Sequence, residues 1–161
     1  MEAQLLTQLG ELAFAEGRGQ EALQFLAESA RLAEAAGFRW WELTALAGMA
    51  EYALRLNQLD VAAEPARKAL RIAHAIHDRQ NVVYALTLLA WLASKNGQPL
   101  RSGRLWGAVE AEAQRGPIGQ WESDRDDYAR RVTQATAAFE RARRKGQQLT
   151  LEQAVKEGLK S

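Results

Sequence analysis

The chain of 161 residues has no cysteine, only two histidines and only three prolines. The absence of cysteine excludes disulfides, thiol nucleophiles and zinc–thiolate sites, and it suits a reducing compartment. No apolar run approaches the roughly 18 residues of a membrane span, and no charged-then-apolar leader opens the chain. We therefore expect a cytoplasmic protein with no membrane segment.

Motifs for catalysis are equally scarce. Nucleophilic catalysis needs a serine or threonine beside a base, yet the only histidines are His74 and His77, and no Gly-x-Ser-x-Gly elbow occurs. A phosphate-binding loop needs four residues between its glycines and then Lys-Ser/Thr. Here five residues separate Gly97 from Gly103, and an arginine follows. We expect no enzymatic activity and no cofactor.

Metal and nucleic-acid sites are not expected either. His74 and His77 are spaced one helical turn apart, on one face of the predicted helix, but no third ligand is evident nearby. Histidines in the last turn of a helix interact favourably with its terminal carbonyls, and this role is favoured here. The basic run RARRK at 141–145 lacks interleaved aromatic residues and has no helix-turn-helix motif beside it. Direct binding of nucleic acid is therefore disfavoured.

The charges are unevenly distributed, although the net charge is only +1. Residues 1–60 carry nine acidic and four basic residues, whereas residues 61–161 carry eleven acidic and seventeen basic residues. The two parts therefore have net charges of −5 and +6. Solvated helix faces produce such an imbalance, and it would also favour an anionic partner for the C-terminal part.

What the sequence does contain is a strong helical pattern. Alanine and leucine are abundant, and apolar residues recur at three- and four-residue spacing almost throughout. Strand-like alternation is absent. The pattern predicts an all-α protein.

The chain aligns with itself when it is shifted by one repeat of about 40 residues. The segment LGELAFAEGRGQEAL (9–23) lies over MAEYALRLNQLDVAA (49–63) and over LAWLASKNGQPLRSG (89–103). Each unit reads as a helix, a short turn with glycine or asparagine, and a second helix. Small residues at matched positions let two antiparallel helices approach to about 8–10 Å. A fixed period in this range is typical of stacked repeats, here predicted at about 3–38, 43–78 and 83–115.

These units resemble the tetratricopeptide repeat. The matching positions are Leu6, Leu9–Gly10, Ala13, Ala22 and Leu26 in the first unit, and Leu46, Met49–Ala50, Ala53, Ala62 and Ala66 in the second. The third unit departs from the pattern at Ser102 and Gly103, and Gly103 is expected to permit close packing. The resemblance implies a right-handed helical solenoid of three helix-turn-helix units that serves in protein–protein interaction.

The repeat pattern ends at Gly116. We expect residues 1–116 to form the repeat array and residues 117–161 to form a helical cap that packs on it. Trp121 resembles a hydrophobic staple at the start of this cap. A Ser-x-x-Asp capping box at 123–126 is expected to open a long helix that runs to about residue 145, and Thr-x-x-Gln at 150–153 a short final helix.

The segments SGRLWGAVEA, RDDYARRVTQATAAF and GQQLTLEQAV together resemble the C-terminal region of large bacterial regulators. These are signal-transduction ATPases and LuxR-type or SARP-type transcription factors, in which a repeat array follows an NTPase module. The resemblance implies a regulatory or sensor module that binds a protein segment, a neighbouring domain or an effector. The first repeat has no polar cap. We therefore expect either a longer protein or a homodimer that covers this face.

By the same family resemblance, the first helix of each unit faces a concave groove. The candidate binding residues there are Glu11, Glu51, Arg55, Tyr84, Trp91 and Lys95. Such a groove could take a helix or a peptide, with the aromatic side chains as anchors. The alternative is that the C-terminal helix folds back and fills it, because an exposed aromatic patch needs covering. The sequence leaves both alternatives open.

Overall fold

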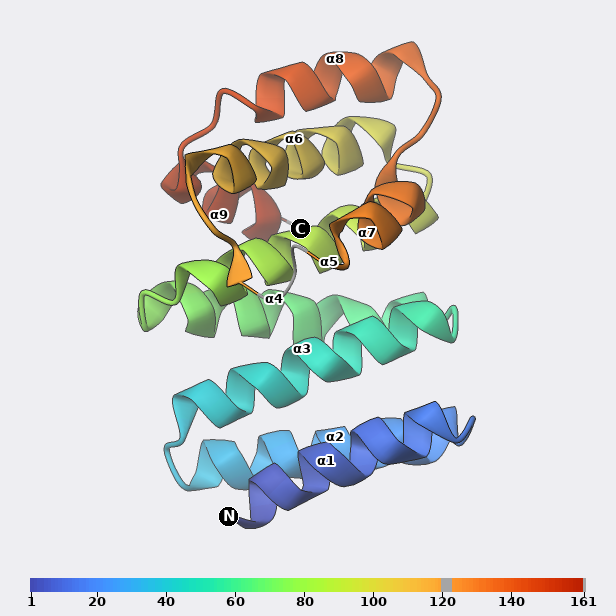
Figure 1. The fold of residues 1–161 in the computed structure, drawn as a ribbon, viewed down its shortest axis with the longest axis vertical. Coiled ribbons are helices and arrows are strands. Elements are labelled where there is room, and N and C mark those ends of the chain that lie inside the picture. The colour runs from blue at the N-terminus through green and yellow to red at the C-terminus, as the bar shows by residue number, and fades with distance from the viewer. Residues whose placement is uncertain (120–122, 161) are drawn as a thin grey trace. The chain divides into compact units, whose positions relative to one another are not determined.

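The structure is a computed structural model that describes residues 1–119 and 123–160 (Figure 1). Within these ranges it contains nine α-helices and no β-strand. The helices are α1 (Glu2–Ala15), α2 (Gly19–Ala35), α3 (Arg39–Arg55), α4 (Leu59–Ala75), α5 (Arg79–Lys95), α6 (Pro99–Arg115), α7 (Arg125–Val132), α8 (Ala137–Gly146) and α9 (Leu151–Leu159). The predicted all-α helical-repeat fold is confirmed. Trp121 lies outside the described residues.

The chain divides into two compact units, Met1–His77 with α1 to α4 and Asp78–Ser161 with α5 to α9. The predicted boundary at 116/117 therefore falls inside the second unit. There the third helical hairpin, α5–α6, packs together with the three C-terminal helices. None of the described helices has both the length and the apolar character that crossing a membrane requires.

The turns between the first six helices recur at a constant spacing. Residues with a left-handed backbone follow five successive helices, with φ between 56° and 79°: Gly17, Gly37, Asn57, His77 and Gly97. Each of α2 to α6 has 17 residues, so one helix and its three-residue turn span 20 residues, which is half of the 40-residue repeat. The residue after each left-handed residue forms a backbone hydrogen bond back to the preceding helix. For example, the Gln98 amide donates to the Ala93 carbonyl at 2.9 Å.

This turn geometry separates the two histidines. His74 lies in the last turn of α4, as predicted, but His77 lies beyond the helix with a φ of 56°. The His77 amide donates to the His74 carbonyl at 3.1 Å. The predicted placement of both side chains on one helical face is therefore wrong, because the chain turns at His77.

Small residues fill the seams of the hairpins in the first unit. The alanines at the matched repeat positions are completely buried: Ala13, Ala22, Ala50, Ala53, Ala62 and Ala66. At Gly10 a Cβ would lie 3.0 Å from Cγ of Leu26 on α2, so the two helices touch closely at this point. The packing role predicted for these positions is confirmed.

A buried ionic contact ties α2, α3 and α4 together. Glu42 is fully buried, and its carboxylate lies 3.0 Å from Arg39 and 2.9 Å from Lys68. The Lys68 ammonium also lies 2.9 Å from Glu34. Burial alone would lower the pKa of Lys68, but the two glutamates outweigh burial and raise it. The carboxylate is tolerated in the interior because two cations accompany it.

The long helix predicted from 123 to about 145 is wrong. The chain forms two helices, because Thr133 is extended and the hydroxyl of Thr136 caps α8 by accepting from the Phe139 amide at 3.2 Å. The capping box predicted at Ser123 is also wrong, since the N-cap of α7 is Asp124, without a side-chain capping bond. The break matters for packing, because it places α7 against α5 and α8 against α6.

The contact between α6 and α8 brings the two backbones unusually close. A Cβ on Gly103 would lie 2.5 Å from the Phe139 carbonyl oxygen. At Gly107 and Gly146 a Cβ would lie closer still to the backbone of the opposite helix. The close packing predicted at Gly103 is therefore confirmed, and its partner is α8.

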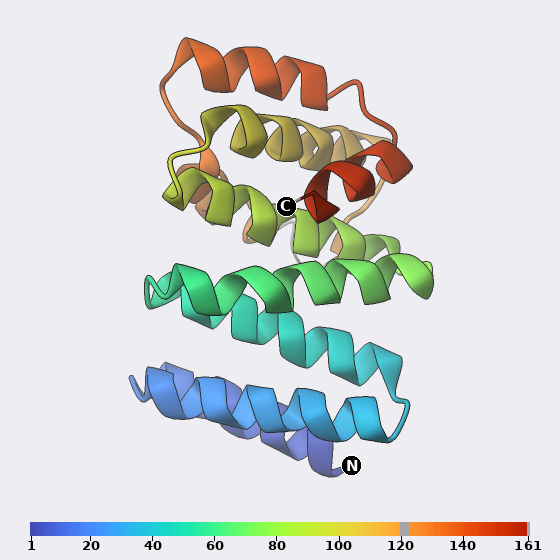
Figure 2. The same ribbon diagram turned by 180° about the vertical axis from the view of Figure 1, so that it is seen from behind.

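The other two C-terminal helices flank the α5–α6 hairpin on opposite faces, α7 on one and α9 on the other (Figures 1 and 2). At the start of α9 the predicted capping box is confirmed: the Thr150 amide donates to Gln153 at 2.9 Å, and the Gln153 amide donates to the Thr150 hydroxyl at 3.2 Å. An ion pair of 3.2 Å between Arg104 and Glu157 holds α9 on α6.

Candidate functional site

The aromatic candidates of the second unit lie beneath α7. Tyr84 and Trp91, both on α5, are 5% and 1% exposed. Tyr128 of α7 packs against both, with ring centroids 6.3 Å from Tyr84 and 6.5 Å from Trp91. The guanidinium carbon of Arg131, also on α7, lies 4.8 Å from the centre of the Trp91 ring. This is cation–π geometry.

Around Tyr84 and Trp91 the structure agrees with the second of the two alternatives that the sequence left open, because the C-terminal segment covers this surface of α5. The link after α7 continues the cover, because Gln134 donates to the Ser94 hydroxyl at 3.0 Å. Lys95, the third candidate of this unit, is exposed in the last turn of α5. Trp91 is therefore not available as an exposed anchor in this structure, since its ring is buried by its own chain.

The acidic and basic candidates of the first unit lie on neighbouring helices. Glu51 and Arg55 are one turn apart on α3, and both Nε and Nη2 of Arg55 donate to one oxygen of Glu51, at 2.9 and 2.6 Å. Glu51 is buried under this contact, whereas Glu11 on α1 is exposed. The site therefore offers one carboxylate to solvent and one held in an ion pair.

Between these charges lies an aromatic pair from the same two helices. Phe14 of α1 stacks on Tyr52 of α3 with ring centroids 3.9 Å apart and planes 6° apart, and both are partly exposed. Burial raises the pKa of Tyr52 to about 12, and the charges of Glu11 and Glu51 add to this effect. We call the surface formed by Glu11, Phe14, Glu51, Tyr52 and Arg55 the α1–α3 surface.

Repeat alignment missed both rings of this pair. The shift by one repeat aligns Phe14 with Leu54 and Tyr52 with Leu12, so the two rings do not share a repeat position. Each aromatic ring is matched with a leucine and reads as an ordinary apolar repeat residue. The pair forms where the first helix of one unit contacts the first helix of the next unit. Such a contact joins residues at different repeat positions, so an alignment of equivalent positions does not detect it.

A hollow lies in the second unit between α6, α7 and α8. Its lining includes Trp106, Glu110, Arg125, Asp126 and Arg143. Arg143 already forms an ion pair within the lining, because its Nε and Nη2 donate to the two carboxylate oxygens of Glu110 at 2.7 and 2.9 Å. The lining charges are balanced and partly satisfied, so this hollow is a weaker candidate than the α1–α3 surface.

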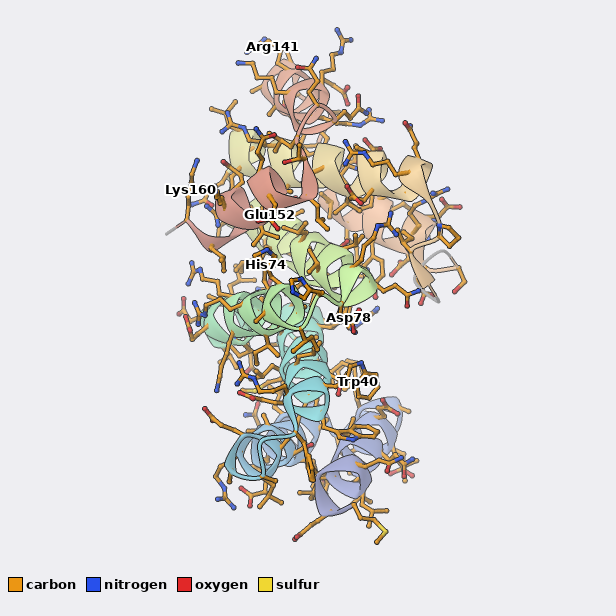
Figure 3. All side chains as sticks on the ribbon, turned by 90° about the vertical axis from the view of Figure 1, so that its left-hand side faces the viewer. Trp40, His74, Asp78, Arg141, Glu152 and Lys160 are labelled. Carbon is orange, nitrogen blue, oxygen red and sulfur yellow. The ribbon has the colours of Figure 1, made fainter. Side chains whose placement is uncertain are left out.

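The basic run of α8 does not act as one patch. Arg143 faces α6 through Glu110, whereas Arg141 extends from the outer side of α8 (Figure 3). Among residues 1–119 and 123–160, no cluster of three or more His, Asp or Glu side chains has the arrangement of a metal site.

Helical hairpins at a fixed spacing, with small buried residues in their seams, define a helical-repeat protein. Residues 1–75 match the family model described as Tetratricopeptide repeat, and this segment lies within the first unit. The match, which covers a little less than half of the chain, supports a tetratricopeptide-type repeat in this segment. Such repeats generally mediate protein–protein interaction. Comparisons with curated proteins and with solved structures gave no match.

Proposed function

We propose that this protein is a non-catalytic interaction module whose α1–α3 surface binds a peptide segment of a partner protein. The observation that carries the proposal is the partly exposed Phe14–Tyr52 stack with a carboxylate beside it. Rigid aromatic side chains give large contact area at little cost in conformational entropy, and they are enriched among residues that dominate binding energy. The tetratricopeptide match over residues 1–75 supports the same role.

The surface also favours a chemical class of peptide. An apolar or aromatic side chain would pack on the exposed edges of the ring pair, and a neighbouring lysine or arginine would face Glu11. Glu51 contributes less charge, because Arg55 already pairs with it at 2.6 Å. The preferred ligand is therefore a segment with an apolar side chain beside a basic one.

The wider context that we propose is a cytoplasmic bacterial signalling or transcription regulator. It rests on the resemblance of the C-terminal segments to those of such regulators. In this context the module would bind a partner protein or a neighbouring domain, and this binding would alter the activity of the regulator.

A random-peptide phage selection against the purified protein tests the binding proposal. We expect selected peptides to bind the Phe14→Ala and Glu11→Gln variants at least tenfold more weakly than the unmodified protein. Glu11 is exposed, so its variant separates lost recognition from lost folding. Phe38→Ala is the matched control, because this phenylalanine is exposed in the turn before α3 and should leave binding unchanged. If no selected peptide depends on Phe14 and Glu11, the proposal fails.

A further inference from the structure

The outer side of α8 carries three positive charges next to one another. Arg141, Arg144 and Lys145 are exposed, and their spacing of three and four residues places them on one face of the helix. That face points away from α6, because Phe139 and Ala142, on the opposite side of α8, are buried against α6. Figure 3 shows Arg141 extending from the outer side of the helix. We call the surface of Arg141, Arg144 and Lys145 the basic face of α8.

The cations of the basic face have no acidic partner. Among the residues that the structure describes, 1–119 and 123–160, none of the three forms an ion pair or a side-chain hydrogen bond. Arg143 of the same run lies on the inner side of α8 and takes up the nearby carboxylates of Glu110 and Glu140, at 2.7 and 3.2 Å. Apart from Arg125, every other arginine of the chain contacts a carboxylate or carbonyl oxygen. Unpaired cations at adjacent positions are therefore exceptional in this chain.

Stabilisation of the helix does not account for this arrangement. Arg144 and Lys145 lie in the last turn of α8, where cations interact favourably with the helix dipole. Arg141 lies before that turn, and like charges follow it three and four residues later. Like charges at helical spacing destabilise a helix. An anionic partner that approaches the basic face would remove this repulsion.

The composition of the basic face favours one class of anionic partner. Two of its cations are arginines, whose planar forks pair with carboxylate and phosphate groups. Three cations within little more than one turn are few for a DNA duplex, on which a protein contacts as many as about 6–10 phosphates. The other exposed residues on this side of α8, Ala137 and Gln148, offer no ring for stacking of bases and no large apolar group for insertion into a membrane. A short run of carboxylates in a protein matches the face best.

We propose that the basic face of α8 binds an acidic segment of a partner protein, in which several aspartate or glutamate side chains lie within one helical turn of each other. Arg141 and Arg144 each pair with a carboxylate, and Lys145 supplies the third positive charge. This site shares no residue with the α1–α3 surface and has the opposite charge preference. The two proposals therefore stand or fall independently.

Two synthetic peptides test the proposal directly. Both are alanine-rich and helix-forming, and the helical positions i, i+3, i+4 and i+7 are glutamate in one and glutamine in the other. Fluorescence anisotropy with the full chain at low ionic strength should show binding of the glutamate peptide, weakening as salt is added, and roughly tenfold weaker binding of the glutamine peptide. Equal binding of the two peptides, or no binding of the glutamate peptide, would overturn the proposal.

Variants of the exposed cations locate the site. The triple variant Arg141→Gln/Arg144→Gln/Lys145→Gln should weaken binding of the glutamate peptide roughly tenfold, while far-ultraviolet circular dichroism is unchanged. Its matched control removes the same charge from other exposed positions of the second unit: Arg125→Gln, Arg130→Gln and Lys156→Gln. The control should weaken binding by about twofold at most, because distant exposed charges are screened. Equal losses in the two triple variants would show attraction by overall charge and would contradict the assignment.

The thermal stability of Arg141→Gln tests whether this cation serves the fold instead. The substitution removes the like-charge contacts with Arg144 and Lys145, so the unfolding midpoint should be unchanged or higher. A lower midpoint would show that Arg141 stabilises α8, and the argument for a partner would fail.

Two further anions distinguish the other classes of partner. A short DNA duplex, or vesicles of equal parts phosphatidylcholine and phosphatidylserine, is added to the complex of the full chain with the labelled glutamate peptide. The proposal predicts that neither displaces the peptide when its negative charge is present at the same concentration as that of the peptide. Displacement by the duplex or by the vesicles would show that the basic face prefers nucleic acid or a membrane, and would overturn the proposal.

Discussion

The close approach of α6 and α8 makes a sharp prediction about one glycine. In Gly107→Ala, the added methyl group would meet the Arg143 carbonyl of α8 far inside van der Waals distance. Carbon–oxygen contacts in proteins are about 3.3–3.6 Å, so the two helices must separate by roughly 1.3–1.6 Å. A radial gap of about 0.5–1 Å already forfeits about a quarter to a half of each dispersion contact across an interface, and this gap is larger.

The expected cost follows from two opposing effects. Overpacking of a close interface costs about 1–3 kcal/mol or more, whereas alanine in place of glycine favours a helix by about 1 kcal/mol. Because the obstacle is backbone rather than a flexible side chain, we expect Gly107→Ala to lower the free energy of unfolding by about 2 kcal/mol. Urea denaturation followed by circular dichroism and tryptophan fluorescence measures the change.

The matched control is Gly48→Ala in α3. There a Cβ would lie 3.5 Å from Cδ1 of Leu26, an ordinary contact, so only the helix-propensity gain remains. We expect this variant to be up to about 1 kcal/mol more stable than the unmodified protein. The two alanine variants should therefore shift stability in opposite directions. A Gly107→Ala protein as stable as the unmodified one would refute the reasoning from backbone contact.

Three further predictions follow from individual side chains. His77→Gly should stabilise the protein by roughly 0.5–1 kcal/mol in thermal denaturation, because a left-handed backbone strains histidine but not glycine, whereas Gly97→Ala should destabilise it. In a spectrophotometric titration, the phenolate absorbance of Tyr52 is the absorbance of the unmodified protein minus that of Tyr52→Phe, and its midpoint should lie near pH 12. The Glu11→Gln substitution should lower this midpoint but leave it above pH 10. Tyr52 ionises at a lower pH in the unfolded chain than in the folded one, because folding raises its pKa. The contribution of this shift to the free energy of unfolding should therefore be complete below pH 10 and be lost as the pH rises toward 12. Trp91→Ala should lower the free energy of unfolding, measured by urea denaturation, by about 3–5 kcal/mol, because the ring is buried. The folded variant should still bind phage-selected peptides as the unmodified protein does. Weaker binding would contradict the burial argument.

The sequence was sufficient to predict the hairpins because their determinants are local. A glycine or asparagine in the left-handed position ends a helix, and an alanine in the seam permits close contact, so both recur at fixed spacing. The same local logic identified the capping box at Thr150.

The C-terminal helices were harder to predict because their arrangement depends on long-range contacts. Thr136 lies within an otherwise helical pattern, but its hydroxyl caps the start of a new helix, and the break lets α7 and α8 pack on different helices. Whether α7 would bury Trp91 could not be read from periodicity either, since an aromatic residue suits an open groove and a core equally. The close backbone approaches at Gly107 and Gly146 were missed because Gly107 aligns with Ala27 and Arg67 in the first two units, and Gly146 lies beyond the repeats.

The central claim is that the α1–α3 surface, and not the aromatic cluster of α5, receives the partner peptide. Amide chemical-shift mapping by NMR with a phage-selected peptide tests it most directly. The claim predicts that the largest shifts cluster at Glu11–Ala15 of α1 and Glu51–Arg55 of α3. Shifts centred on Trp91 and α7 would contradict it, because they would require the C-terminal helices to open and the buried aromatic cluster to bind the peptide.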